Sequence, residues 1–282
     1  MNDIQDLELL SHDRKALEHT KIPMVTVAAS FRHDLKQTYH IKDTDPKSAE
    51  VLFSRAHYSM ALGVAMQEWK SHVDPSKAWL VDPTNYVQHH DWSKVEFTAA
   101  MGQVMARNSL LKFVKDLIDT KVRSKLPITD AITTPLLYLF EKVDRPILSF
   151  HYEAGNILAK VGKRVIQVVT DPHVRDQYLE YAQLPTMRFC VFDQNTKTAF
   201  LEKAAVLEKQ VDPKRIIITG PPVDPRIIAC RKNKRSSQVK KRALRLCITT
   251  GGLGTNKKEI EECVRSLAPL FSKQKSLTSV PC

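Results

Sequence analysis

Short apolar runs rich in β-branched residues alternate along the chain with longer segments whose apolar residues recur at helical spacing. The predicted strands are residues 24–29, 78–82, 131–134, 146–150, 164–170, 188–192, 216–219 and 246–250. The predicted helices are residues 48–70, 96–120, 153–161, 195–209 and 257–271, and Gly162 is expected to end the third of them. Such alternation is typical of a parallel sheet with crossover helices. The sequence therefore predicts an α/β fold with a Rossmann-like sheet.

A glycine-rich loop lies between the predicted strand 246–250 and the predicted helix 257–271. In such a turn the free backbone N–H groups and the positive end of the helix dipole converge on an anion. The candidates for this phosphate cradle are Gly251, Gly252, Gly254 and Thr255. The same glycines also permit close packing of a strand against a helix, and that alternative stays open.

The domain organisation follows from the position of this loop. We expect a first Rossmann-like domain over residues 1–228, a basic linker over 229–244, and the start of a second Rossmann-like domain over 245–282. A single strand–helix unit cannot bury a core of its own. The second domain is therefore expected to be incomplete, and the sequence to be the front part of a longer protein.

The formal net charge of +12 indicates an anionic partner or surface. Much of the positive charge lies in residues 231–235 and 240–242. This stretch is read as a solvated linker, or as a segment attracted to anionic lipid headgroups. Nucleic acid is not expected, because no helix-turn-helix, zinc-finger or RNP-type motif accompanies the charge.

Cysteine usage and hydropathy exclude several classes of protein. The five cysteines are an odd number without a CxxC pair, which argues against a disulfide framework and a structural zinc site. No apolar run approaches the roughly 20 residues that a membrane span requires. Residues 1–21 also lack the apolar core of a secretory signal. We expect a cytoplasmic protein, with peripheral attachment to the inner face of the membrane as an option.

Ligands of open parallel sheets bind beyond the carboxyl ends of the strands, so the residues after each predicted strand are candidate site residues. They are His33, Asp34, His151, Glu153, Asp171 and His173. Each also has an ordinary structural interpretation, such as a hydrogen-bonded loop histidine at His33 or a turn cap at Asp171. Asp171 and His173 lack a third ligand at a recognised spacing, so no metal is expected.

The order of several motifs resembles that of a known family. These are Ser149-Phe150-His151, the strand that ends in Thr170-Asp171, the run Cys190-Val191-Phe192-Asp193, and residues 212–226, which contain Gly220-Pro221-Pro222-Val223-Asp224-Pro225. The order resembles the back half of the N-terminal domain in GT-B glycosyltransferases of family 28. Within that family it is most similar to the diacylglycerol glycosyltransferases, including monogalactosyldiacylglycerol synthases. The resemblance covers about Pro146 to Gly254, under half of the chain.

The resemblance implies two Rossmann-like domains facing a cleft, with the acceptor on the first and the nucleotide-sugar donor on the second. It implies an inverting, metal-independent transfer without a cofactor, from a UDP-sugar to a lipid or other hydroxyl acceptor. His33 is the base by position, with Asp34 assisting it. The glycine loop would hold the diphosphate, with Lys257 or Lys258 as an added cation. The acceptor side of the cleft would be lined by His151, Glu153, Asp171 and His173.

Two departures from the family pattern keep other functions open. Family members have glycines after the first strand, whereas residues 29–34 contain none. The second domain is also nearly absent. A non-catalytic binding or scaffold protein derived from such an enzyme is therefore the main alternative. An enzyme of the nucleotide-sugar epimerase type is a third, and it would need no acceptor.

Overall fold

The computed structural model describes residues 2–28, 55–87, 91–95, 97–98, 127–234, 248 and 257–272. The chain divides into two compact units, of which the first comprises residues 1–99 and 125–238 and the second residues 100–124 and 239–282. The first unit holds every described strand. In the second, helix α10 (Lys257–Ser272) confirms the predicted helix 257–271. The predicted strand 246–250 lies outside the described residues except for Ile248.

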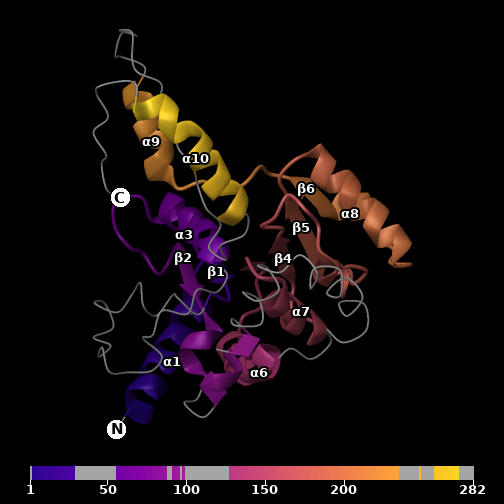
Figure 1. Ribbon diagram of the computed structural model, residues 1–282. Coiled ribbons are helices and arrows are strands. Elements are labelled where there is room, and N and C mark those ends of the chain that lie inside the picture. The colour runs from indigo at the N-terminus through magenta and orange to yellow at the C-terminus, as the bar shows by residue number, and fades with distance from the viewer. Residues whose placement is uncertain are drawn as a thin grey trace. The chain divides into compact units, whose positions relative to one another are not determined.

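A six-stranded sheet forms the centre of the first unit (Figure 1). Its strands are β1 (Ile22–Val25), β2 (Ala78–Val81), β3 (Ile147–Ser149), β4 (Val165–Val168), β5 (Met187–Val191) and β6 (Ile216–Ile218). They lie in the order β2-β1-β3-β4-β5-β6, and all neighbouring pairs are parallel. The near-continuous apolar character of β1 to β4 suits strands that are covered on both faces, whereas Ile217 and Ile218 of the edge strand β6 are exposed. The prediction of an α/β fold with a Rossmann-like parallel sheet is confirmed.

Helices cover both faces of the sheet. They are α1 (Asn2–His19), α3 (Arg55–Trp69), α6 (Pro127–Phe140), α7 (Tyr152–Lys160) and α8 (Gln194–Val206), with short 3₁₀ turns η2 (Pro83–Tyr86), η5 (Asp176–Leu179) and η6 (Pro213–Arg215). Helix α9 (Pro225–Lys234) contacts α3. Gly162 follows α7 with a φ of 81° and ends that helix as predicted. Residues 48–54 and most of the predicted helix 96–120 lie outside the described residues.

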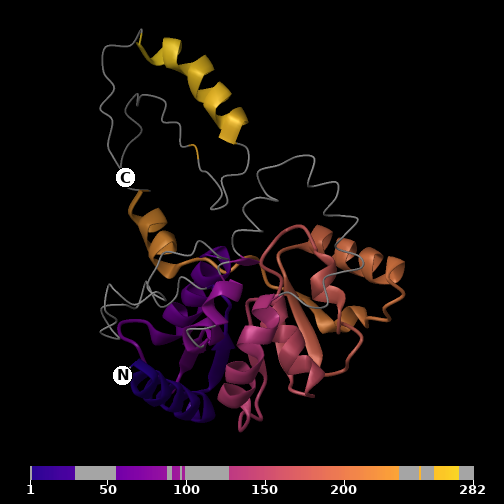
Figure 2. The same cartoon turned by 60° about the horizontal axis from the view of Figure 1, so that its bottom comes forward.

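Two apolar cores lie on the two faces. The smaller core packs Tyr58, Ala61 and Ala65 of α3 against Met24 and Leu80. The larger core contains the buried side chains of α1, α6, α7 and α8. Crossovers between parallel strands are right-handed, so the direction in which the chain moves along the sheet decides which face a connecting helix covers. The chain moves from β1 to β2 in one direction and builds β3 to β6 in the other, and the connecting helices therefore cover opposite faces. Figure 2 shows α1 and α6 side by side in the first unit.

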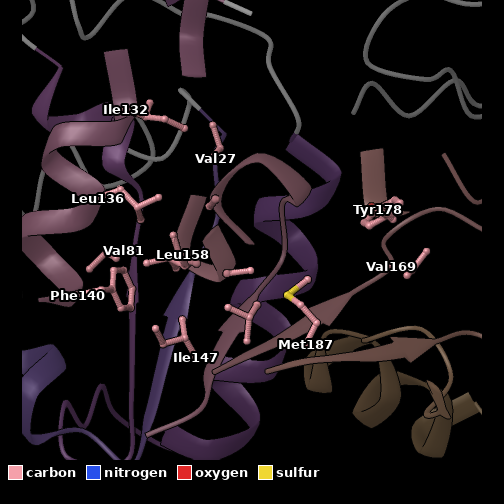
Figure 3. Close-up of a cluster of buried hydrophobic side chains, with 14 of the residues drawn as sticks. Val27, Val81, Ile132, Leu136, Phe140, Ile147, Leu158, Val169, Tyr178 and Met187 are labelled. Atoms are coloured by element: carbon pink, nitrogen blue, oxygen red, sulfur yellow. The ribbon is translucent and has the colours of Figure 1, made fainter. Parts of the chain in front are cut away.

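Helix α6 contributes several side chains to the larger core. Figure 3 shows Ile132, Leu136 and Phe140 of this helix facing Val27 and Val81 at the carboxyl ends of β1 and β2. All five side chains are fully buried. Each contributes about 1.5–3 kcal/mol relative to an exposed position. Helix α6 is therefore an integral part of the core.

The predicted strand 131–134 is wrong, because these residues lie within α6. The β-branched residues Ile132, Thr133 and Thr134 favour a strand when only four positions are considered. Over the longer window the buried residues recur at helical spacing; they are Ile128, Ala131, Ile132, Leu136, Leu139 and Phe140. Pro135 lies inside this helix.

Helix α1 is not foreseen by the sequence, since residues 2–19 show little amphipathic pattern. A buried carboxylate on this helix anchors it. Asp13 accepts hydrogen bonds from the Trp79 indole N–H at 3.2 Å and from the Tyr86 hydroxyl. Burial raises the pKa of Asp13, partly offset by these donors. The partners lie far from Asp13 in the sequence, so only the fold brings them together.

Helix α7 packs closely on β4 through a glycine. A Cβ atom on Gly155 would lie 2.0 Å from Oε1 of Gln167 and 3.2 Å from Oγ of Ser149. Gln167 has no room to turn away, because it is buried and its Nε2 donates to the carbonyls of Ser149 and Val168 at 3.1 and 2.9 Å. The position therefore excludes any side chain.

We predict that Gly155→Ala destabilises the protein by about 1–3 kcal/mol, because overpacking outweighs the roughly 1 kcal/mol gain in helix propensity. Chemical denaturation measures the change. In a Gln167→Ala background the clashing amide is gone, so the same substitution should no longer destabilise. An equal penalty in both backgrounds would contradict the packing explanation.

Candidate functional site

The strand order locates the candidate site. From β1 the chain passes to β2 on one side, and β3 later pairs with β1 on the other side. The carboxyl ends of β1 and β3 therefore flank a topological switch point, where open α/β sheets bind ligands. The two ends are joined by a 2.9 Å hydrogen bond from the Phe150 N–H to the Val25 carbonyl. His151 is the next residue along the chain.

His151 caps helix α7 with its side chain. Its Nδ1 accepts the Glu153 backbone N–H at 3.3 Å, and its carbonyl accepts the Ser149 hydroxyl at 2.8 Å. Since Nδ1 accepts, the proton of the neutral ring is on Nε2. Burial, with a smaller effect from His57 and Arg175, holds the pKa of His151 well below 6.5. His151 is therefore a neutral hydrogen-bond donor at this edge and does not have the features of a general base.

The structure adds one histidine that the sequence analysis does not single out. His57, in the first turn of α3, lies with its ring centroid 4.9 Å from that of His151. The His151 ring also lies 4.5 Å from the Tyr152 ring, which contacts the Tyr178 ring edge-on at 5.4 Å. These four residues form an aromatic cluster at the switch point. No local motif marks His57, because its role depends on where α3 packs.

Glu153 lies in the first turn of α7, where a carboxylate interacts favourably with the helix dipole. It is buried, and Oε2 accepts the Thr129 hydroxyl of α6 at 2.9 Å. Along the same helix, the Asn156 amide donates to the Gln177 carbonyl at 2.9 Å and to Glu180 at 3.1 Å. Glu153 thus links α7 to α6, and Asn156 links α7 to η5.

The loop after β4 brings a guanidinium group to the site. Asp171 Oδ2 lies 3.2 Å from Nε of Arg175, and both side chains are partly exposed. The buried Tyr178 hydroxyl lies 2.9 Å from the Thr170 hydroxyl and accepts the Thr170 N–H at 3.2 Å. Burial raises the pKa of Tyr178, so its phenol stays neutral. His173 is exposed on the same loop.

Asp82 fixes the backbone at the end of β1. Its fully buried carboxylate accepts the Ala28 N–H at 2.8 Å, the Thr84 N–H at 2.9 Å and the Thr84 hydroxyl at 2.7 Å. Hydrogen bonds to a charged acceptor are stronger than neutral ones. Asp82 therefore holds the point at which the chain leaves β1 for residues 29–54.

Polar side chains are buried in unusual density between β3 and η5; they are Ser149, His151, Glu153, Asn156, Gln167, Thr170 and Gln177. Burial of polar groups carries a desolvation cost, and apolar side chains at these positions would avoid that cost. Their hydrogen bonds run to one another and to the backbone, so they fix the start of α7 and the loop after β4 at one edge of the sheet. The partly exposed Arg175 guanidinium, paired with Asp171, adds positive charge at this edge.

The structure therefore places His151 at the N-cap and Glu153 in the first turn of α7, directly after β3, and it places Asp171 and His173 on the loop after β4. The other predicted site residues, namely His33, Asp34, Gly251, Gly252, Gly254 and Thr255, lie outside the described residues. Within the described part of the chain, no group of three or more His, Cys, Asp or Glu side chains is arranged to hold a metal ion. The described helices also include none of the length and apolar character needed to span a bilayer.

Comparison of the chain with protein-family models, with curated proteins and with solved structures gives no match.

We predict that His151 gives the protein a pH-dependent stability. The unfolded chain takes up a proton near pH 6.5 and the folded imidazole does not, so the free energy of unfolding falls as the pH drops below about 6.5. The slope contributed by one such group is at most about 1.4 kcal/mol per pH unit. The effect is measured as the change in denaturation midpoint across a pH series from about 5 to 8, which brackets the usual pKa of histidine.

The matched variants are His151→Asn and His173→Asn. Asparagine still caps a helix but does not titrate in this range, so His151→Asn should flatten the dependence. His173→Asn, which removes an exposed imidazole, should leave it in place. If His151→Asn retains the wild-type slope, the buried neutral imidazole is not its source.

Proposed function

We propose that this protein is a nucleotide-sugar-dependent glycosyltransferase of the GT-B type. In this proposal its first unit is the acceptor side, and the reaction transfers a sugar from a UDP-sugar to a hydroxyl group of a lipid acceptor. The supporting observation is that the segments carrying the family resemblance form consecutive strands β3 to β6 of one parallel sheet. Their carboxyl ends meet at one edge, where the candidate acceptor residues lie.

The chemistry of the proposal is an in-line displacement. His33 takes the proton from the acceptor hydroxyl, and Asp34 stabilises the imidazolium that forms. The acceptor oxygen attacks the anomeric carbon from the face opposite the nucleotide, while the bond from that carbon to the diphosphate oxygen breaks. UDP leaves with its electron pair, and the sugar is transferred with inversion. In this scheme His151 lines the acceptor side of the cleft.

The negative charge that develops on the leaving diphosphate must be stabilised by hydrogen-bond donors or positive groups. In the proposal, backbone N–H groups of the glycine loop bind the departing diphosphate; these belong to Gly251, Gly252, Gly254 and Thr255. Lys257 and Lys258 follow the loop at the start of α10 and supply positive charge. The roles of the loop residues rest on the sequence alone.

The alternative is a non-catalytic binding protein derived from such an enzyme. The observation in its favour is the lack of glycine in residues 29–34, where close approach of the backbone to the donor is required. Asp82 holds the start of this segment, which is compatible with either function.

The direct test supplies the full-length protein with UDP- and GDP-sugars and a diacylglycerol in mixed micelles. We expect release of UDP together with a glycosylated lipid, detected by mass spectrometry. Nucleotide release only in the presence of acceptor separates a transferase from a hydrolase. An isomerised sugar formed without acceptor would indicate an epimerase, and no turnover of any donor would favour the binding protein.

We predict that His33→Gln lowers kcat/KM for transfer at least about 100-fold, because general-base catalysis contributes roughly 100- to 10,000-fold. His40→Gln, in the same stretch of sequence, is the matched control and should retain activity. The denaturation midpoint of each variant separates a loss of catalysis from a loss of folding. Equal activity of the two variants would remove His33 from its proposed role.

A further inference from the structure

Helix α1 and the turn that leads into β2 form an open hollow of about 260 Å³. It lies beside the amino ends of β1 and β2, whereas the candidate site lies at the carboxyl ends of the strands. Carbon atoms make up nearly all of its wall, although half of its lining residues are basic. The lining residues are His12, Lys15, Ala16, His19, Pro75 and Ser76.

One wall of this hollow is held in place by a buried carboxylate. The His12 ring places Nδ1 3.2 Å from Oδ1 of Asp13, and it contacts the Trp79 ring edge-on with the ring centroids 5.7 Å apart. The indole N–H of Trp79 donates to the same Asp13 oxygen, and the Tyr86 hydroxyl donates to the other. The imidazole is therefore positioned before a ligand arrives, which lowers the entropy cost of binding.

The rim of the hollow carries positive charge. Lys15 and His19 are exposed, and they share one face of α1 with His12 because residues three and four positions apart on a helix are neighbours. None of the described lining residues is acidic. Asp74, just before the turn, is already paired with Lys77 at 3.2 Å. The charge of the lining therefore favours an anion.

The C-terminal end of a helix carries partial negative charge, which would oppose an anion near the end of α1. Arg145 offsets this charge, because its guanidinium donates to the Glu18 carbonyl at 2.9 Å and to the Thr20 carbonyl. The Thr20 N–H also donates to the Ala16 carbonyl at 2.9 Å. The last turn of α1 thus has its carbonyl groups engaged beside the hollow.

We propose that this hollow binds a small organic phosphate with a flat apolar body, such as an aryl phosphate monoester. The ring packs between Ala16, Pro75 and the His12 imidazole, and the phosphate oxygens accept hydrogen bonds from Lys15 and His19 at the rim. A phosphate dianion suits two basic groups better than a single carboxylate does. The site does not depend on the proposed transferase activity, since it lies at the opposite ends of the strands.

The test titrates the full chain with phenyl phosphate at low salt and follows binding by saturation-transfer difference NMR and calorimetry. We expect phenyl phosphate to bind at least about tenfold more tightly than inorganic phosphate, which has no ring, and than benzyl alcohol, which has no charge. High salt should weaken the binding of phenyl phosphate. Equal affinity for inorganic phosphate would overturn the proposal, because it would indicate simple attraction of an anion to a basic surface.

Matched variants locate the site. Lys15→Gln/His19→Gln should weaken binding at least about tenfold, because the charged hydrogen bonds are lost. Lys142→Gln/His173→Gln makes the same changes at exposed residues outside the hollow and should leave the affinity unchanged. Ala16→Phe fills the hollow without changing its charge and should also weaken binding, and the denaturation midpoint of each variant checks its folding. Unchanged affinity of the Lys15→Gln/His19→Gln variant would place the phosphate elsewhere and overturn the proposal.

Discussion

The hydrogen bond from the Glu153 N–H to Nδ1 of His151 is the interaction on which the candidate site depends. It starts helix α7 immediately after β3, beside the switch point of the sheet. It also fixes the imidazole tautomer, since the ring must accept at Nδ1 and therefore donates from Nε2. One contact thus sets the start of a helix and the orientation of a side chain, and burial keeps that imidazole neutral.

The polar interior around this contact makes the site rigid. Asn156 links α7 to η5, Gln167 spans from β4 to the β3 backbone, and the Tyr178 hydroxyl contacts Thr170 at the end of β4. Burying each polar group costs free energy unless its hydrogen-bond partners are held in place by the fold. A site built in this way keeps its geometry before any ligand arrives, which is what binding or catalysis at a fixed edge requires.

The sequence predicts β3 to β6, α7 and α8 within a few residues, because their apolar runs are short, distinct and separated by Gly, Pro or Asp. It also predicts His151 at the carboxyl edge, since the residue that follows a parallel strand must lie there. It does not predict the capping role of His151 or the approach of His57, because both arise from packing between distant elements. The pattern at residues 131–134 wrongly predicts a strand, because four β-branched or small residues carry too little periodicity to reveal a helix.

The most direct measurement is side-chain nitrogen NMR of the histidines, recorded before and after a UDP-sugar and a short-chain diacylglycerol are added. At neutral pH the account predicts a neutral, Nε2-protonated ring for His151, and shifts of the His151 and His57 resonances when the ligands bind. A protonated or Nδ1-protonated His151 would contradict the cap geometry. Unchanged His151 and His57 resonances at saturating ligand would show that the carboxyl edge of β1 and β3 is not the binding site.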